Sequence, residues 1–123
     1  MKVRFFCPLW GSKDIPFADF VNRAKNEGYD GVEISLPDTP DMQKEYLSVL
    51  FDYDMPYIIQ HWQTDNKNVD EYISEYATRM EMNAHSKPIF INSQTGKDFF
   101  SFEGIKNPNP SSSCCTSLFL YPK

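Results

Sequence analysis

The residues of this chain that are best suited to chemistry stand at the ends of short apolar runs. Glu33 lies inside one such run, His61 and Trp62 close a second, and Asn92 and Gln94 follow a third. An unpaired carboxylate is costly to bury among apolar neighbours. An imidazole can serve as an acid, a base, a metal ligand or a hydrogen-bonding group. These side chains are therefore candidates for a site that handles a polar molecule.

Their combination with indole rings suits a small polyhydroxylated ligand. Carboxylates and amides form hydrogen bonds with hydroxyl groups, and the faces of tryptophans stack on C–H surfaces. We predict the substrate-binding residues to be Trp10, Glu33, His61, Trp62, Asn92 and Gln94. Structural interpretations stay open beside this one: Glu33 paired with a nearby Lys or Arg, His61 as a structural hydrogen-bonding group, and the indoles as core. No catalytic residue is assigned.

The motifs of several cofactor and nucleophile sites are missing from the sequence. It contains no Gly-x-Gly-x-x-Gly, no Walker loop, no nucleophile elbow and no Cys-x-x-Cys pair. A catalytic metal usually needs three or more His and carboxylate ligands. Glu33 and His61 are the only credible ones, so we expect this chain to hold no metal and no other cofactor.

Strands and helices must alternate to position these candidates. Runs rich in β-branched and aromatic residues cover residues 3–6, 31–35, 56–61 and 88–92. Amphipathic helical periodicity with helix-end signals covers residues 16–27, 41–53 and 69–85. Asn68 is the expected N-cap of the third helix. The expected apolar faces of the three helices are Phe17, Phe20, Val21 and Ala24; Tyr46, Leu47, Leu50 and Phe51; and Val69, Ile73, Tyr76, Ala77, Met80 and Ala84. This alternation predicts an α/β domain with four parallel strands and three helices. Ligands bind beyond the carboxyl ends of such strands, which is where the candidates fall.

The sequence changes character near its C-terminal end. Residues 104–123 contain no acidic residue, although the chain has 17, and they hold two of its three cysteines. A helix should follow the fourth strand, and this proline-rich segment does not supply one. We therefore divide the chain into a domain at 1–103 and an irregular tail at 104–123. The tail is either a natural end or a non-native one that follows a frameshift or an early stop.

Length and composition narrow the classes further. A chain of 123 residues suits one domain, whereas a complete (β/α)₈ barrel needs about 250 residues. No apolar run reaches the ~18 residues of a membrane span, so no membrane partner is expected. The net charge of −5 argues against nucleic acid, which requires clustered Lys and Arg. Three cysteines without metal or disulfide spacing indicate a reducing, cytoplasmic location.

Several strings, taken in order, resemble one known superfamily. They are Trp10-Gly11, Gly28-Tyr29-Asp30-Gly31-Val32-Glu33, Ile59-Gln60-His61, and residues 91–98, which read Ile-Asn-Ser-Gln-Thr-Gly-Lys-Asp. Together they resemble the sugar phosphate isomerase/epimerase superfamily, whose members are TIM barrels similar to xylose isomerase. The resemblance covers residues 1–103 and implies the first half of such a barrel. It also implies that Glu33 and His61 face the substrate pocket.

The resemblance carries further expectations about activity. Members of this superfamily typically hold one divalent metal (Mn, Mg, Co or Zn) through Glu, Asp, His and Glu on the last four strands. Two of those glutamates usually move a proton next to a carbonyl group. None of these ligands has a counterpart here. The resemblance therefore implies a truncated member of a sugar (phosphate) isomerase or epimerase family, inactive as this chain, whose ligand is a small sugar or sugar phosphate.

Two more expectations follow from this half-barrel interpretation. The outer edges of the first and fourth strands would carry unpaired backbone groups, which favours self-association. The DNA-repair branch of the superfamily has a His on its fourth strand, where this chain has Asn92-Ser93-Gln94, so a trinuclear zinc site is not expected.

Two alternatives to a truncated enzyme remain open. One is a small non-enzymatic α/β module that binds a polar ligand. The other is such a module with flavodoxin-like topology, in which residues 117–121 form the last strand.

Overall fold

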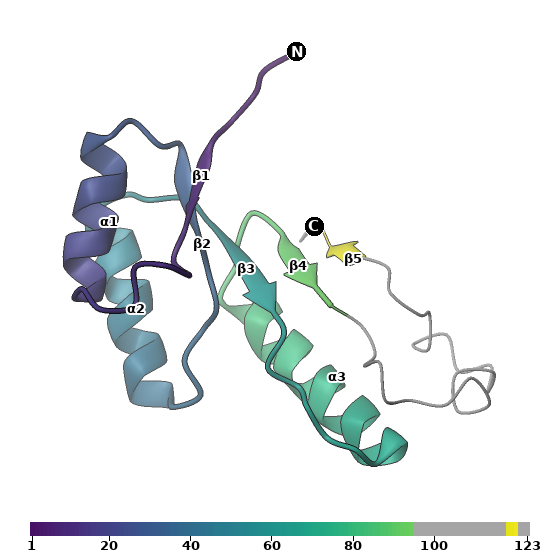
Figure 1. The fold of residues 1–123 in the computed structure, drawn as a ribbon. Coiled ribbons are helices and arrows are strands. Elements are labelled where there is room, and N and C mark those ends of the chain that lie inside the picture. Colours follow the sequence, from purple (N-terminus) through teal and green to yellow (C-terminus); the bar gives the residue numbers. More distant parts are fainter. Residues whose placement is uncertain (95–117, 121–123) are drawn as a thin grey trace.

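The computed structural model describes residues 1–94 and the backbone of residues 118–120 (Figure 1). Four parallel strands alternate with three helices along residues 1–94, which confirms the predicted α/β class. The elements, in chain order, are β1 (Phe6–Pro8), α1 (Phe17–Asn26), β2 (Gly31–Ile34), α2 (Pro40–Asp52), β3 (Tyr57–His61), α3 (Val69–His85), β4 (Ile91–Ser93) and β5 (Leu118–Leu120). No helix in the described part of the chain is both long enough and apolar enough to cross a bilayer.

The four parallel strands lie side by side in the order of the sequence. Each crossover therefore moves one place in the same direction across the sheet. Because parallel crossovers are right-handed, all three helices are placed on one face. A flavodoxin-like sheet has the order 2-1-3-4-5, with a reversal after its first strand. The flavodoxin-like alternative is therefore wrong for these strands.

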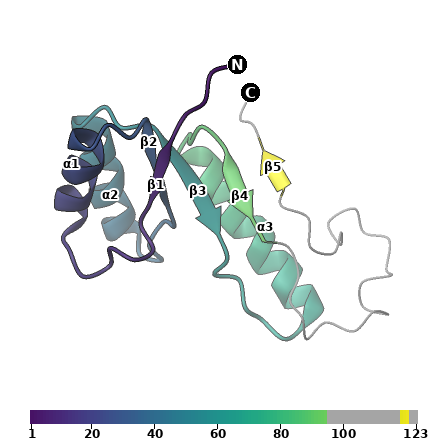
Figure 2. The ribbon, with the colours of Figure 1, turned by 45° about the horizontal axis from the view of Figure 1, so that its top comes forward.

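The helix-covered face of the sheet holds the core. Val32, Ile34, Ile59 and Ile91 point toward the helices and join one hydrophobic cluster with buried residues of α1, α2 and α3. Figure 2 shows α1 and α2 beside β1 and β2, and α3 beside β3 and β4. Successive strand residues point to opposite faces. The residues between these apolar ones therefore point to the face that no described helix covers.

Helix α1 packs as its periodicity predicts. Phe17, Phe20, Val21 and Ala24 are all buried. The helix ends before Gly28, whose φ of +84° lies in the left-handed region that glycine tolerates. The sequence thus specifies both the buried face of this helix and the turn that leads into β2.

The other two helices differ in detail from their predicted faces. In α2 Leu50 is buried, whereas Phe51, which we expected on the apolar face, is exposed. In α3 Tyr72 and Met80 are buried, whereas Ala77, which we expected in the buried stripe, is exposed. A tyrosine ring removes far more apolar area from water than an alanine methyl does. The orientation of α3 therefore favours its rings over its alanines.

Helix α3 begins at a side-chain cap. Asn68 Oδ1 accepts hydrogen bonds from the backbone N–H groups of Asp70, at 3.0 Å, and Glu71, at 3.1 Å. This is the cap that the sequence predicts, and it satisfies two N–H groups that the helix itself leaves without partners. By contrast, Thr39 at the start of α2 makes no capping bond with its side chain.

The first strand starts later than expected, at Phe6 rather than at residue 3. The backbone N–H of Phe5 donates to Asp30 Oδ2, and the N–H of Asp30 donates to the Phe5 carbonyl, each at 2.8 Å. The side chain of Asp30 thus takes up a backbone donor just before regular pairing with β2 begins.

A fifth strand lies in the segment that we expected to be an irregular tail, and it falls within residues 117–121, which the flavodoxin-like alternative offered as a last strand. β5 pairs antiparallel with β4, and the register joins Asn92 to Phe119. It covers the edge of β4 that we expected to be unpaired. The boundary at residue 103, the adjacent pair Cys114 and Cys115, and the rest of residues 95–117 lie outside the described residues.

The close approach of β1 and β2 depends on a glycine. A Cβ atom at Gly31 would overlap the Phe6 ring and the Pro56 carbonyl oxygen. We predict that Gly31→Ala lowers the free energy of unfolding by about 1–3 kcal/mol, the usual cost of overpacking. Urea denaturation measures this change in the free energy of unfolding. The substitution should still destabilise a Phe6→Ala background, because the Pro56 oxygen remains. A change within about 0.5 kcal/mol would contradict this packing argument.

Candidate functional site

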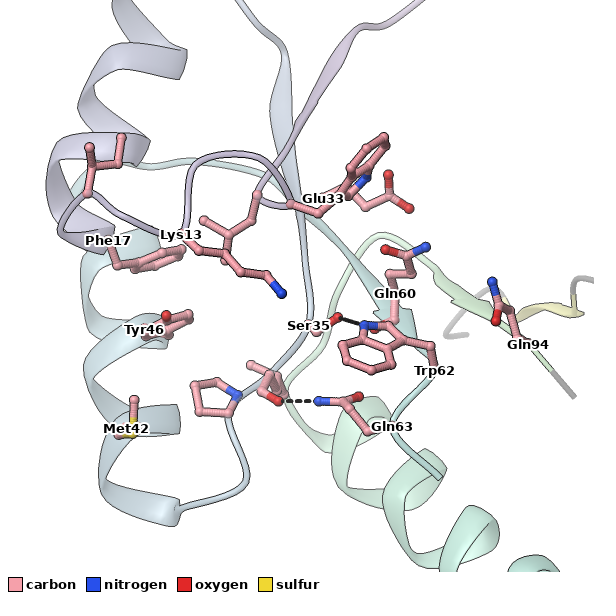
Figure 3. A pocket seen from close by; sticks show the side chains of 15 residues that line it. Lys13, Phe17, Glu33, Ser35, Met42, Tyr46, Gln60, Trp62, Gln63 and Gln94 are labelled. Atoms are coloured by element: carbon pink, nitrogen blue, oxygen red, sulfur yellow. Dashed lines mark hydrogen bonds between the residues drawn. The ribbon is translucent and has the colours of Figure 1, made fainter. Parts of the chain in front are cut away.

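A cavity of about 600 Å³ opens at the carboxyl ends of β1, β2 and β3 (Figure 3). The loop after β1, the ends of β2 and β3, and the N-terminal halves of α1 and α2 surround it. This is the edge of a parallel sheet at which ligands usually bind. Its aromatic, polar and charged lining residues are Trp10, Lys13, Phe17, Glu33, Ser35, Tyr46, Gln60, Trp62, Gln63 and Gln94.

The cavity brings together several of the residues predicted from the sequence. Trp10, Glu33, Trp62 and Gln94 line it. Asn92 is not part of the lining, but its Nδ2 donates a hydrogen bond of 3.3 Å to Glu33 Oε1. The carboxylate thus has an amide partner from β4, two strands away. No ion pair among the described residues involves Glu33, so the pairing with Lys or Arg that we left open is not the one found.

His61 does not face the cavity, although the resemblance implied that it would. Gln60 lines the cavity, and the alternation along β3 turns the next side chain to the opposite face. His61 is accordingly 1% exposed, and its Nε2 lies 2.8 Å from Thr64 Oγ1. The edge of its ring meets Tyr76 of α3. The structural interpretation of His61, as a hydrogen-bonding group at a strand end, is the one that the structure shows.

The same buried layer continues to β4. The hydroxyl of Tyr76 lies 2.9 Å from Ser93 Oγ, and Ser93 is fully buried. Polar groups in such a layer are stable only when they are hydrogen-bonded. The His61, Thr64, Tyr76 and Ser93 side chains therefore join α3 to the back of the strands that carry the cavity.

The Tyr76–Ser93 bond should contribute measurably to stability. We predict that Tyr76→Phe, which leaves Ser93 Oγ buried without this partner, lowers the free energy of unfolding by about 1–3 kcal/mol. Tyr29→Phe, at an exposed tyrosine, is the control and should change it by less than about 0.5 kcal/mol. Thermal and urea denaturation followed by circular dichroism measure both. Equal effects of the two substitutions would contradict the assigned role of Tyr76.

A chain of hydrogen bonds fixes the indole of Trp62 at the cavity. Trp62 Nε1 donates to Ser35 Oγ at 3.0 Å, and the Ser35 hydroxyl donates to the Gln60 carbonyl oxygen at 2.8 Å. Figure 3 shows the ring held against the end of β2. The side-chain amide of Gln63 donates to the Leu36 carbonyl at 2.8 Å. The positions of these groups are therefore set before any ligand arrives.

An aromatic pair forms the opposite wall. The rings of Phe17 and Tyr46 stack with their centroids 3.8 Å apart and their planes 3° from parallel. Burial raises the pKa of Tyr46, and the nearby Glu45 carboxylate raises it further. The hydroxyl of Tyr46 is therefore neutral at ordinary pH, so this wall offers an apolar surface and no negative charge.

Sequence reasoning passed over several lining residues. Ser35 and Gln60 point to the same face as Glu33 and Asn92, so strict alternation along β2 and β3 would have selected them in place of His61. Lys13 lies in the loop after β1, with its Nζ 5.9 Å from the centre of the Trp62 ring. No periodicity in the sequence marks a loop residue of this kind.

The described residues do not fit the metal site of the superfamily that the sequence resembles. No group of three His, Cys, Asp or Glu side chains gathers anywhere in residues 1–94. Glu33 is the one carboxylate in the described cavity lining. We therefore derive no metal-dependent step for this cavity.

Comparisons with protein-family models, with curated proteins and with solved structures find no match to this chain.

Proposed function

We propose that the cavity binds a small polyhydroxylated molecule such as a sugar. The observation that carries this proposal is the half-buried Glu33 carboxylate, held by Asn92 and facing a cavity with an indole on its rim. A carboxylate accepts strong hydrogen bonds from ligand hydroxyl groups. Gln60 and Gln94 add amides that both donate and accept. The exposed faces of Trp10 and Trp62 suit the C–H surfaces of a sugar ring.

We also propose that the chain is related to the sugar (phosphate) isomerases and epimerases. The support is the sequential order of four parallel strands with helices on one face, which is how consecutive units of a (β/α)₈ barrel are arranged. In the superfamily that the sequence resembles, two glutamates on the last four strands usually move the proton next to the carbonyl group, and residues 1–94 supply no counterpart to that pair at the cavity. Because the described lining supplies one carboxylate, the proposal for this chain is binding without isomerase or epimerase turnover.

A non-enzymatic binding module is the second candidate, and β5 favours it. The antiparallel pairing of β5 with β4 closes an edge at which a barrel would continue with a parallel strand. A chain of this kind has an open sheet that does not continue into a barrel. The cavity would then be the whole ligand site. Turnover by the purified chain would count against both this module and the binding-only proposal.

Glu33 should determine the affinity for neutral sugars. We predict that a panel of pentoses and hexoses shifts the amide resonances of residues around the cavity, and that Glu33→Gln weakens binding about tenfold or more. A hydrogen bond to a charged group contributes about 1.5–3 kcal/mol, and 1.4 kcal/mol is a factor of ten. NMR titration measures the dissociation constants, and the same samples report any interconversion of the sugars.

Glu27→Gln is the matched control, because Glu27 is exposed at the end of α1 and the charge change is identical. It should leave the affinity unchanged. Circular dichroism confirms that both variants are folded. The proposal fails if no sugar shifts these resonances at tens of millimolar, or if the two substitutions weaken binding equally.

A further inference from the structure

We propose that Lys13 makes the cavity select a polyhydroxylated ligand with an anionic group at one end. This inference rests on the proposed function and adds a specificity-determining residue that the sequence did not indicate. The ligand would lie with its hydroxyl groups toward Glu33 and Gln60 and its anion toward Lys13.

The loop after β1 places Lys13 at the cavity. Gly11 has a φ of +104°, and the backbone N–H of Ser12 donates to the Leu9 carbonyl at 2.9 Å. The N–H of Ile15 then donates to the Ser12 carbonyl at 3.4 Å. These two turns bring the loop back toward the ends of β2 and β3. Figure 3 shows the Lys13 side chain extended into the cavity, between the wall of Phe17 and Tyr46 and the indole of Trp62.

The ammonium of Lys13 lies near the indole of Trp62. Lys13 Nζ lies 5.9 Å from the centre of the Trp62 ring, at the outer limit of a cation–π contact. The bond from Trp62 Nε1 to Ser35 fixes the plane of that ring. Among the described residues, no carboxylate pairs with Lys13, so its charge is available to a ligand.

The charges around the cavity are separated. Lys13 is the one cationic side chain in the described lining, and neither ion pair in the described part of the chain includes it. Asp14, the next residue in sequence, is not part of the lining. The carboxylate of Glu33 extends from β2, apart from the Lys13 amino group in Figure 3. One end of the cavity thus favours an anion, and the other favours hydroxyl donors.

The charge of the whole molecule makes this local cation decisive. The chain carries a net charge of −5, which repels anionic ligands at long range. Among the charged side chains of the described lining, Lys13 is the one that can offset this repulsion. The ammonium of lysine is a compact charge with no demand for paired oxygens. Carboxylate and phosphate groups share the chemistry that it recognises, and a titration with both distinguishes them.

The test compares three probes that differ at one end: glucose, gluconate and glucose 6-phosphate. NMR titration of the full chain at about 0.05 M and about 0.5 M salt measures their affinities. We expect one or both anions to bind about three- to tenfold more tightly than glucose at low salt, with the difference reduced at high salt. Lys13→Gln should lower the ratio of anion affinity to glucose affinity to about one at low salt.

Lys44→Gln is the matched control, because it removes the same charge from an exposed position on α2 outside the cavity. It should leave the preference for anions intact. If glucose binds as well as both anions, or if the two lysine substitutions act equally, the role of Lys13 is overturned while sugar binding stands. If Lys13→Gln weakens the binding of glucose as much as the binding of the anions, the role of Lys13 is again overturned. If no probe binds, the proposed function itself fails.

Discussion

The direction of the parallel crossovers is the constraint on which the rest of this structure depends. Each of the strands β2, β3 and β4 is added beside the previous one on the same side, and right-handed connections then place α1, α2 and α3 on one face. The buried cluster forms on that face alone. The carboxyl ends of the strands, and the loops that leave them, are left to surround a cavity. A single reversal in strand order would have put a helix on the other face and removed this arrangement.

The two-residue period of the strands then divides the side chains between core and cavity. Val32 and Ile34 enter the core, and Glu33 and Ser35 between and beyond them reach the cavity. The same alternation sends His61 into the buried layer with Thr64 and Tyr76. The polar groups of the chain therefore serve two purposes. The polar groups on the helix-covered face of the sheet hold α3 in place. The polar groups at the carboxyl ends of the strands are available to a ligand.

The sequence predicts most of the helices and strands and part of their buried faces, because helix periodicity and capping residues are local patterns. Helix α3 has its expected bounds and its Asn68 cap, and the buried face of α1 is the predicted one. The errors arise where contacts with distant parts of the chain determine how a side chain is placed. Phe51 carries an apolar side chain that no described neighbour buries. The face to which the His61 side chain points is set by the register of β3. Lys13 is placed by two loop turns that leave no periodic pattern in the sequence.

The edge of β4 is where the two interpretations of this chain exclude each other. A strand has one free side once its neighbour is in place, and β5 occupies that side of β4 in antiparallel register. A barrel needs a parallel fifth strand at the same backbone groups, reached through a helix. The two pairings compete for the same N–H and carbonyl groups of β4. The cavity does not depend on which of them prevails, because its described lining comes from β1, β2, β3, their following segments and Gln94 just beyond β4. The proposed ligand binding at this edge therefore needs only the first four strands and the segments that follow them.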